Sequence, residues 1–181
     1  MKRISAVLVT CVLLLIPAAL AEEAQMPTPQ PTEQHEVLEM WVGKWSGEAE
    51  MKPSPFGPGG PMKWTEDCSW FGGVGFHVVC TSEGSGPMGD MQGLGIITYN
   101  PEKGVYTHYG IDSAGWTGHS EGSLEGDTWS FQSKESMGGQ EFYSRFSMTE
   151  VSPGVMTFVW QTSEDGETWV TLMEGTNRKA N

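Results

Sequence analysis

Basic residues are scarce in this sequence. Lysine and arginine number 10 against 23 aspartate and glutamate residues, and the formal net charge at pH 7 is −13. A surface with this excess of negative charge repels polyphosphate backbones and anionic lipid headgroups at long range. The composition therefore argues against nucleic acid as a partner.

Long apolar runs are also lacking, except at the N-terminus. Two basic residues precede an apolar stretch at residues 4–16, and residues 17–21, PAALA, place small side chains where a signal peptidase reads. The run is too short to anchor a chain in a bilayer. We expect a signal peptide at 1–21 cleaved after Ala21, giving an exported protein, periplasmic or extracellular, with no integral membrane segment after processing.

Only three cysteines are present, and Cys11 lies inside the predicted signal peptide. The remaining pair, Cys68 and Cys80, is expected to form a disulfide in an oxidising compartment. If residues 73–75, GVG, form a turn between two strands, then residues whose numbers add up to 148 face each other, as these two do. Two free buried thiols are the alternative. Neither cysteine has a second cysteine or histidine at ligand spacing, so we predict no metal.

The mature chain begins with a segment that cannot form a core. Residues 22–32 alternate proline with small polar residues, which is typical of a disordered, extended leader. Thr32 then suits the N-cap of a short helix over 33–42, with Gly43 as its stop. We expect residues 33–181 to form a single domain.

From residue 44 the sequence changes to short runs separated by Gly, Asn, Asp and Pro, a pattern that predicts antiparallel strands joined by tight turns. Period-2 alternation supports this, for example in Phe142, Ser144, Phe146 and Met148. The predicted strands are 44–51, 62–71, 76–83, 91–99, 105–112, 116–124, 128–134, 141–150, 155–163 and 168–178.

Ten sequential hairpin strands without a helical crossover leave two sheet edges exposed unless the sheet closes on itself. The predicted fold class is therefore all-β, an antiparallel up-and-down β-barrel of about ten strands, lipocalin-like, with a short N-terminal helix. A two-sheet sandwich is the alternative.

Three stretches carry a resemblance to a known family. Residues 38–48 read LEMWVGKWSGE, residues 93–101 read GLGIITYNP, and residues 173–179 read MEGTNRK. Together they resemble the secreted domain-of-unknown-function family fifteen-seventy-nine, over nearly all of 35–179. That family is grouped with lipocalin-like, calycin-type barrels whose function is uncharacterised.

The resemblance implies structural roles for three residues. In such barrels a Gly-x-Trp in the first strand packs under the barrel and a late arginine lies across the indole; Gly43, Trp45 and Arg178 match those places. The opening Gly-x-Trp-x-Gly also resembles nitrobindin-type haem barrels. Their haem ligand is a histidine near the C-terminus, however, and this chain has no histidine after His119, so we predict no cofactor.

His108 and His119 flank a predicted turn at residues 113–115. With a three-residue turn, His119 pairs with Tyr109 and the two histidines point to opposite sides; with a two-residue turn they share a face. Even together they would form an incomplete zinc site.

The leading functional hypothesis is a barrel that binds a small hydrophobic molecule in its lumen. Tyr106, His108, Tyr143 and Arg145 are the candidate polar anchors, because such pockets are mostly apolar with a few placed polar groups. A filled barrel that acts as an interaction module through its acidic surface is the alternative, followed by a barrel enzyme. We find no catalytic constellation, since the serines lack the strand-turn-helix context of a nucleophile.

Overall fold

The computed structural model describes residues 28–55, 57–137 and 139–180. The predicted signal peptide at 1–21 and most of the predicted leader at 22–32 lie outside these residues, so both stay predictions. Within the described residues, every helix is too short or too polar to cross a membrane.

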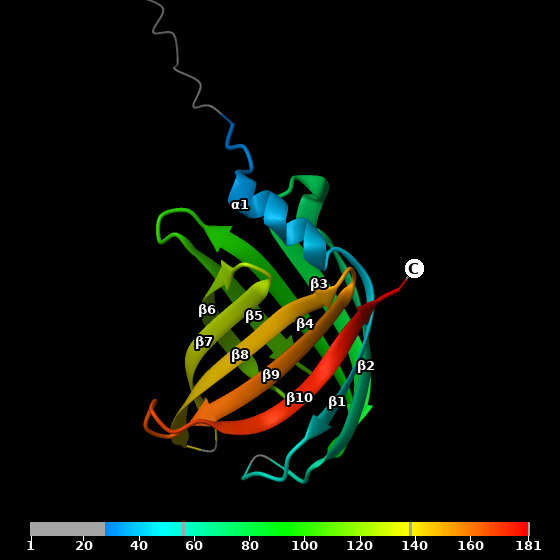
Figure 1. The fold of residues 1–181 in the computed structure, drawn as a ribbon, viewed down its shortest axis with the longest axis vertical. Coiled ribbons are helices and arrows are strands. Elements are labelled where there is room, and N and C mark those ends of the chain that lie inside the picture. Colours follow the sequence, from blue (N-terminus) through cyan, green and yellow to red (C-terminus); the bar gives the residue numbers. More distant parts are fainter. Residues whose placement is uncertain (1–27, 56, 138, 181) are drawn as a thin grey trace, which may run out of the picture. The chain divides into compact units, whose positions relative to one another are not determined.

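Ten antiparallel strands close into one barrel, in which each strand pairs with its sequence neighbours and β1 pairs with β10 (Figure 1). This confirms the predicted up-and-down barrel and excludes the sandwich. The strands are β1 (Gly43–Met51), β2 (Gly60–Trp70), β3 (His77–Gly86), β4 (Gly89–Asn100), β5 (Val105–Asp112), β6 (Thr117–Glu125), β7 (Thr128–Met137), β8 (Gln140–Ser152), β9 (Val155–Ser163) and β10 (Val170–Lys179).

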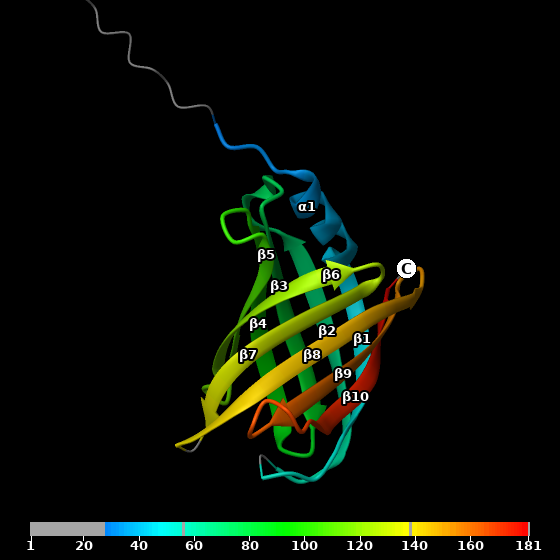
Figure 2. The same ribbon diagram turned by 60° about the vertical axis from the view of Figure 1, so that its left-hand side comes forward.

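The N-terminal helix is shorter than the predicted 33–42. One α-helical turn, α1 (Glu33–Glu36), runs into the 3-10 helix η1 (Val37–Trp41), and the two lie across one end of the barrel (Figures 1 and 2). Leu38 is fully buried there. The Tyr106 hydroxyl donates a hydrogen bond to the Gln34 carbonyl (3.2 Å). These contacts close this end of the barrel.

The structure places Trp45 inside the barrel and Arg178 on its outer face. Trp45 is buried, and its Nε1 donates to the Trp41 carbonyl (2.8 Å). The cation over its ring is Lys179, whose Nζ lies 5.4 Å from the ring centroid. The register explains the difference: Trp45 is opposite Lys179, so Arg178 points to the outer face opposite Ser46.

Gly43 occupies a backbone conformation that favours glycine, with φ of 124°. A Cβ at this position would also lie 2.9 Å from Lys179 Cε. Glycine therefore lets the first strand begin directly beneath Lys179.

The predicted disulfide is confirmed. Cys68 on β2 and Cys80 on β3 are bonded and directly opposite in the register. Their connection is longer than the three-residue turn expected, because the 3-10 turn η2 (Phe71–Gly73) follows β2 and β3 begins only at His77. Facing residues still have numbers that add up to 148, because the longer connection has the same midpoint as the predicted turn.

Candidate ligand-binding site

Glycine lines one half of the inner wall. The buried pair Cys68 and Cys80 faces inward, and its cross-strand row continues through Gly95, Gly110 and Gly118 on β4, β5 and β6. The same alternation turns Gly84, Gly86, Gly93 and Gly122 inward. Because glycine has no side chain, few side chains extend from this half of the wall into the interior.

Two tryptophan rings lie against inward-facing glycines, Gly47 on β1 and Gly118 on β6. A Cβ at Gly47 would lie 2.0 Å from Cε2 of Trp64, and one at Gly118 would lie 2.2 Å from Cζ2 of Trp116. The indoles therefore occupy space next to the wall that any larger residue would take. Trp116 is fixed there by a hydrogen bond from its Nε1 to Glu135 (3.2 Å).

The interior next to Gly93 is bounded by its own neighbouring strands. A Cβ at Gly93 would meet only Ser82 Oγ (2.7 Å) and the Ile111 carbonyl (3.6 Å) within 4 Å. Both belong to strands next to β4, so no atom of the opposite wall lies within 4 Å of that position.

Four inward-facing polar side chains border this half of the lumen. Glu66 lies opposite Ser82, and His108 lies opposite Ser120. All four are half-buried, and within the described part of the chain none has a hydrogen-bond partner for its side chain. Half-buried polar groups without partners in the chain are free to bond to solvent or to a ligand, which makes this set a candidate binding site.

The other half of the wall is aromatic. Phe146 and Phe158 stack with ring centroids 5.4 Å apart, and Trp64 packs against Phe158 at 5.8 Å. Trp160 is partly accessible, and its Nε1 already donates to Ser144 Oγ (2.7 Å). This half therefore offers flat apolar surface on which the Trp160 indole nitrogen is already satisfied.

Burial keeps both titratable groups of the polar set close to neutral. It raises the pKa of Glu66 to about 7. It also lowers the pKa of His108, and the nearby His119 lowers it further. Pairs of groups shifted in this way are typical of functional sites.

Two of the four predicted anchors face the lumen and two do not. His108 lies in the lumen beside Phe131, at a ring distance of 6.2 Å. Tyr106 points inward but is packed beneath the helix that closes the barrel. Tyr143 is exposed on the outer face, and Arg145 stacks on Trp169 there, 4.3 Å from the ring centroid.

The correction for Tyr143 and Arg145 follows from alternation on β8. Phe142, Ser144 and Met148 are buried, so the residues between them must point outward. The sequence prediction missed Glu66, Ser82 and Ser120. Glu66 could have been found, because it shares a strand face with Trp64 and Cys68.

The register also decides the histidine question. His119 pairs with Tyr109, and the two rings lie 4.6 Å apart on the outer face, so His108 and His119 point to opposite sides. Among the described residues, one group of three potential metal ligands occurs, namely Glu66, Cys68 and Cys80. The disulfide uses both thiols, so this group is not a metal site.

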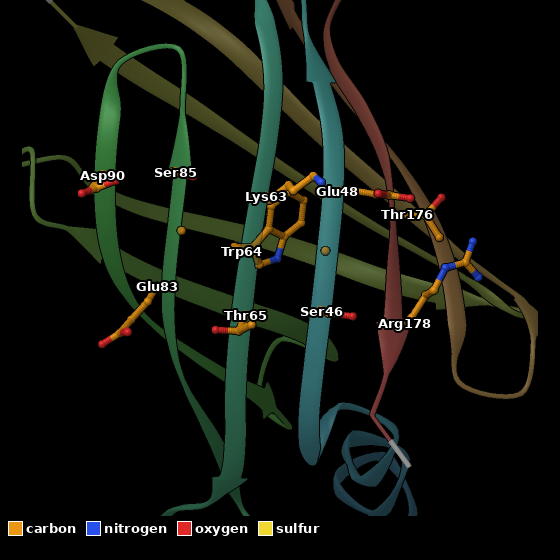
Figure 3. Close-up of a pocket in the computed structure, with 12 residues that line it drawn as sticks. Ser46, Glu48, Lys63, Trp64, Thr65, Glu83, Ser85, Asp90, Thr176 and Arg178 are labelled. Carbon is orange, nitrogen blue, oxygen red and sulfur yellow. The ribbon is translucent and has the colours of Figure 1, made fainter.

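A shallow hollow of about 710 Å³ lies on the outer face of β1, β2, β3 and β10 (Figure 3). Most of its lining side chains point away from the lumen. Lys63 and Arg178 stand among Glu48, Glu83 and Asp90. Charges of both signs are interleaved, so the hollow presents no field of one sign to a partner.

A closed, ten-stranded antiparallel barrel with an N-terminal helical plug is a lipocalin-like architecture. The chain belongs to the family described as "Protein of unknown function (DUF1579)", whose model matches residues 30–179. No curated protein matches the chain.

Two solved structures are similar. Rv2717c from M. tuberculosis has 11% sequence identity and a TM-score of 0.60, covering 83% of this chain and 99% of that one. EF1p2_mFAP2b bound to DFHBI has 13% identity and a TM-score of 0.44, covering 81% and 98%. At these identities the likeness to Rv2717c concerns the fold alone.

Proposed function

We propose that this chain is an exported binding protein whose lumen holds a small, largely apolar molecule. The observation that carries the proposal is accessible space inside the barrel, because the inward-facing side chains of Glu66, Ser82 and His108 are only half-buried. Around it stand aromatic rings on one side and a few unpartnered polar groups on the other. Small-molecule sites typically combine such surfaces.

The alternative, a filled barrel acting through its acidic surface, has weaker support. The inward-facing side chains of Ser82, His108 and Trp160 all keep some accessibility. A core packed to the usual density would leave such side chains covered by their neighbours.

Lumen binding can be tested with a matched pair of variants. Gly93→Leu adds a side chain to the inner face of β4, whereas Gln92→Leu adds the same side chain to the exposed outer face. Native mass spectrometry should detect a co-purifying small molecule on wild-type protein, and tryptophan quenching should detect 2-naphthylmethanol, an uncharged probe. Both signals should survive Gln92→Leu and be lost in Gly93→Leu.

Equal binding by both variants would contradict the proposal. So would the lack of any bound mass and any quenching in wild-type protein. Circular dichroism establishes that each variant is folded before its binding is compared.

Export is supported by the signal-like N-terminus and by the Cys68–Cys80 disulfide, because disulfides persist in oxidising compartments. Denatured protein collected from outside the cytoplasm should have the mass of residues 22–181 less two hydrogens. A full-length mass in that fraction would contradict cleavage after Ala21.

A further inference from the structure

The inner wall carries negative charge without a compensating cation. Glu66 and Glu135 face the lumen, as does Asp112 by the register of β5. Glu135 accepts from Trp116 and Ser133, and Asp112 accepts from two backbone amides of its own turn. Glu66 alone of the three has no hydrogen-bond donor within the described chain.

The cations of the described chain lie elsewhere. The four ion pairs use Lys44, Lys52, Lys103 and Lys134, all on exposed side chains. Lys63 points to the outer face, as do Arg145 and Arg178, and Lys179 lies over Trp45 at the closed end. No lysine or arginine of the described residues therefore faces Glu66 across the lumen.

The surroundings of Glu66 give its carboxyl no hydrogen bond within the described chain. A carboxylate oxygen lies within 4.8 Å of both disulfide sulfurs, Trp45 is directly opposite on β1, and Ser82 is opposite on β3. His108 is the basic group of the polar set, and it is neutral at pH 7 because burial lowers its pKa. An isolated carboxyl in such a place is costly unless a partner arrives.

Aromatic surface begins on the same face of the same strand. Trp64 is two residues from Glu66, and its ring leads to Phe158 and then to Phe146. Asn177 Oδ1, which is buried and lacks a donor, lies beside the Trp64 indole. This part of the wall thus combines flat apolar surface with acceptors that lack donors.

Resting on the proposed lumen function, we propose that the ligand is a small aromatic base, an amine or a nitrogen heterocycle, whose protonated nitrogen pairs with the Glu66 carboxylate while its ring packs along Trp64 and Phe158. A ligand that arrives as free base takes the proton of the Glu66 carboxyl. A ligand that arrives protonated displaces that proton to solvent. In either case one proton moves and no electrons are transferred.

Three probes that share one ring system test the charge preference: 2-naphthylmethylamine, 2-naphthylmethanol and 2-naphthoate. Wild-type protein should bind the amine at least tenfold more tightly than the alcohol, and the carboxylate most weakly, as measured by tryptophan quenching. Because Glu66 is protonated below about pH 7, amine affinity should fall up to tenfold per pH unit below that point.

Glu66→Gln should remove both the preference for the amine and its pH dependence, so that the variant binds amine and alcohol with equal affinity. Asp67→Asn is the matched control, because Asp67 is the next residue and points outward to Lys44; it should bind all three probes as wild type does. Equal binding of amine and alcohol by wild-type protein, or tightest binding of the carboxylate, would overturn the inference and leave lumen binding intact. Binding of none of the three would overturn both.

Discussion

At the scale of single residues, the interior is shaped by where glycine alternates with large rings. Inward-facing glycines leave room for two indoles, Trp64 at Gly47 on β1 and Trp116 at Gly118 on β6. A Cβ at either glycine would overlap the indole, whereas at Gly93 only atoms of the neighbouring strands lie within 4 Å. The candidate site lies along this part of the wall.

Glu66 should make the stability of this protein depend on pH. Its folded-state pKa of about 7 is above its ordinary value of 4.5, so the unfolded chain loses the proton first as pH rises. The free energy of unfolding therefore falls by about 3 kcal/mol in total between about pH 4.5 and pH 7. Above pH 7 this group causes no further loss.

Urea unfolding of wild type and Glu66→Gln at pH 4.5, 7 and 8.5 measures this contribution. The variant should gain about 3 kcal/mol relative to wild type between the first and last pH, because glutamine does not titrate. Asp67→Asn, on the outer face, should give no comparable gain. Parallel pH profiles for Glu66→Gln and wild type would show that Glu66 titrates normally.

At the scale of elements, the start of the β2–β3 connection and the helical plug pack together at the same end of the barrel. The Cys68–Cys80 bond ties β2 to β3 beneath η1, where Leu38 and Trp45 are buried. Trp129, also fully buried, donates through Nε1 to Met40 Sδ (2.9 Å). This end is a packed core, and the open part of the lumen lies beyond it.

Removing the disulfide should weaken this packed end. The double substitution Cys68→Ala with Cys80→Ala opens the loop closed by two residues 12 apart in the sequence. The unfolded chain gains conformational entropy, so the free energy of unfolding should fall by about 3 kcal/mol. Chemical unfolding of the variant should resemble that of reduced wild-type protein, which serves as the control. An unchanged unfolding midpoint in both would mean that the bond adds nothing to stability.

At the scale of the whole molecule, closure joins the two ends of the barrel sequence. β10 pairs with both β9 and β1, so the last strand completes the wall and leaves no open sheet edge. The wall is cooperative because every strand has two hydrogen-bonded neighbours.

Deletion of residues 170–181 should therefore abolish cooperative unfolding, because β1 and β9 would both become unpaired edges. Thermal scans by tryptophan fluorescence should give a single transition for the full chain and none for the truncated one. Deletion of residue 181 alone serves as the control and should unfold like the full chain. A sharp transition in the truncated chain would show that closure is dispensable.

The sequence by itself determined the strands, their meandering order and the disulfide. Alternation, turn residues and the edge problem are local or additive signals, so they predicted the barrel and all ten strands, each with both ends within three residues of the observed ends. The pairing of Cys68 with Cys80 followed in the same way, whereas the place of Trp45 was implied by the family resemblance. Of the predicted anchors, His108 alone remains in the open part of the site.

Only the tertiary structure decided which polar groups share the lumen. Tyr143 and Arg145 lie outside the lumen because neighbouring residues of a strand point to opposite faces. His119 lies outside it for the same reason. Lys179, and not Arg178, lies over Trp45, because these two neighbouring residues also point to opposite faces. Glu66 became important because closure surrounds it with apolar neighbours and no cation, and burial of this kind arises from strands far apart in the chain.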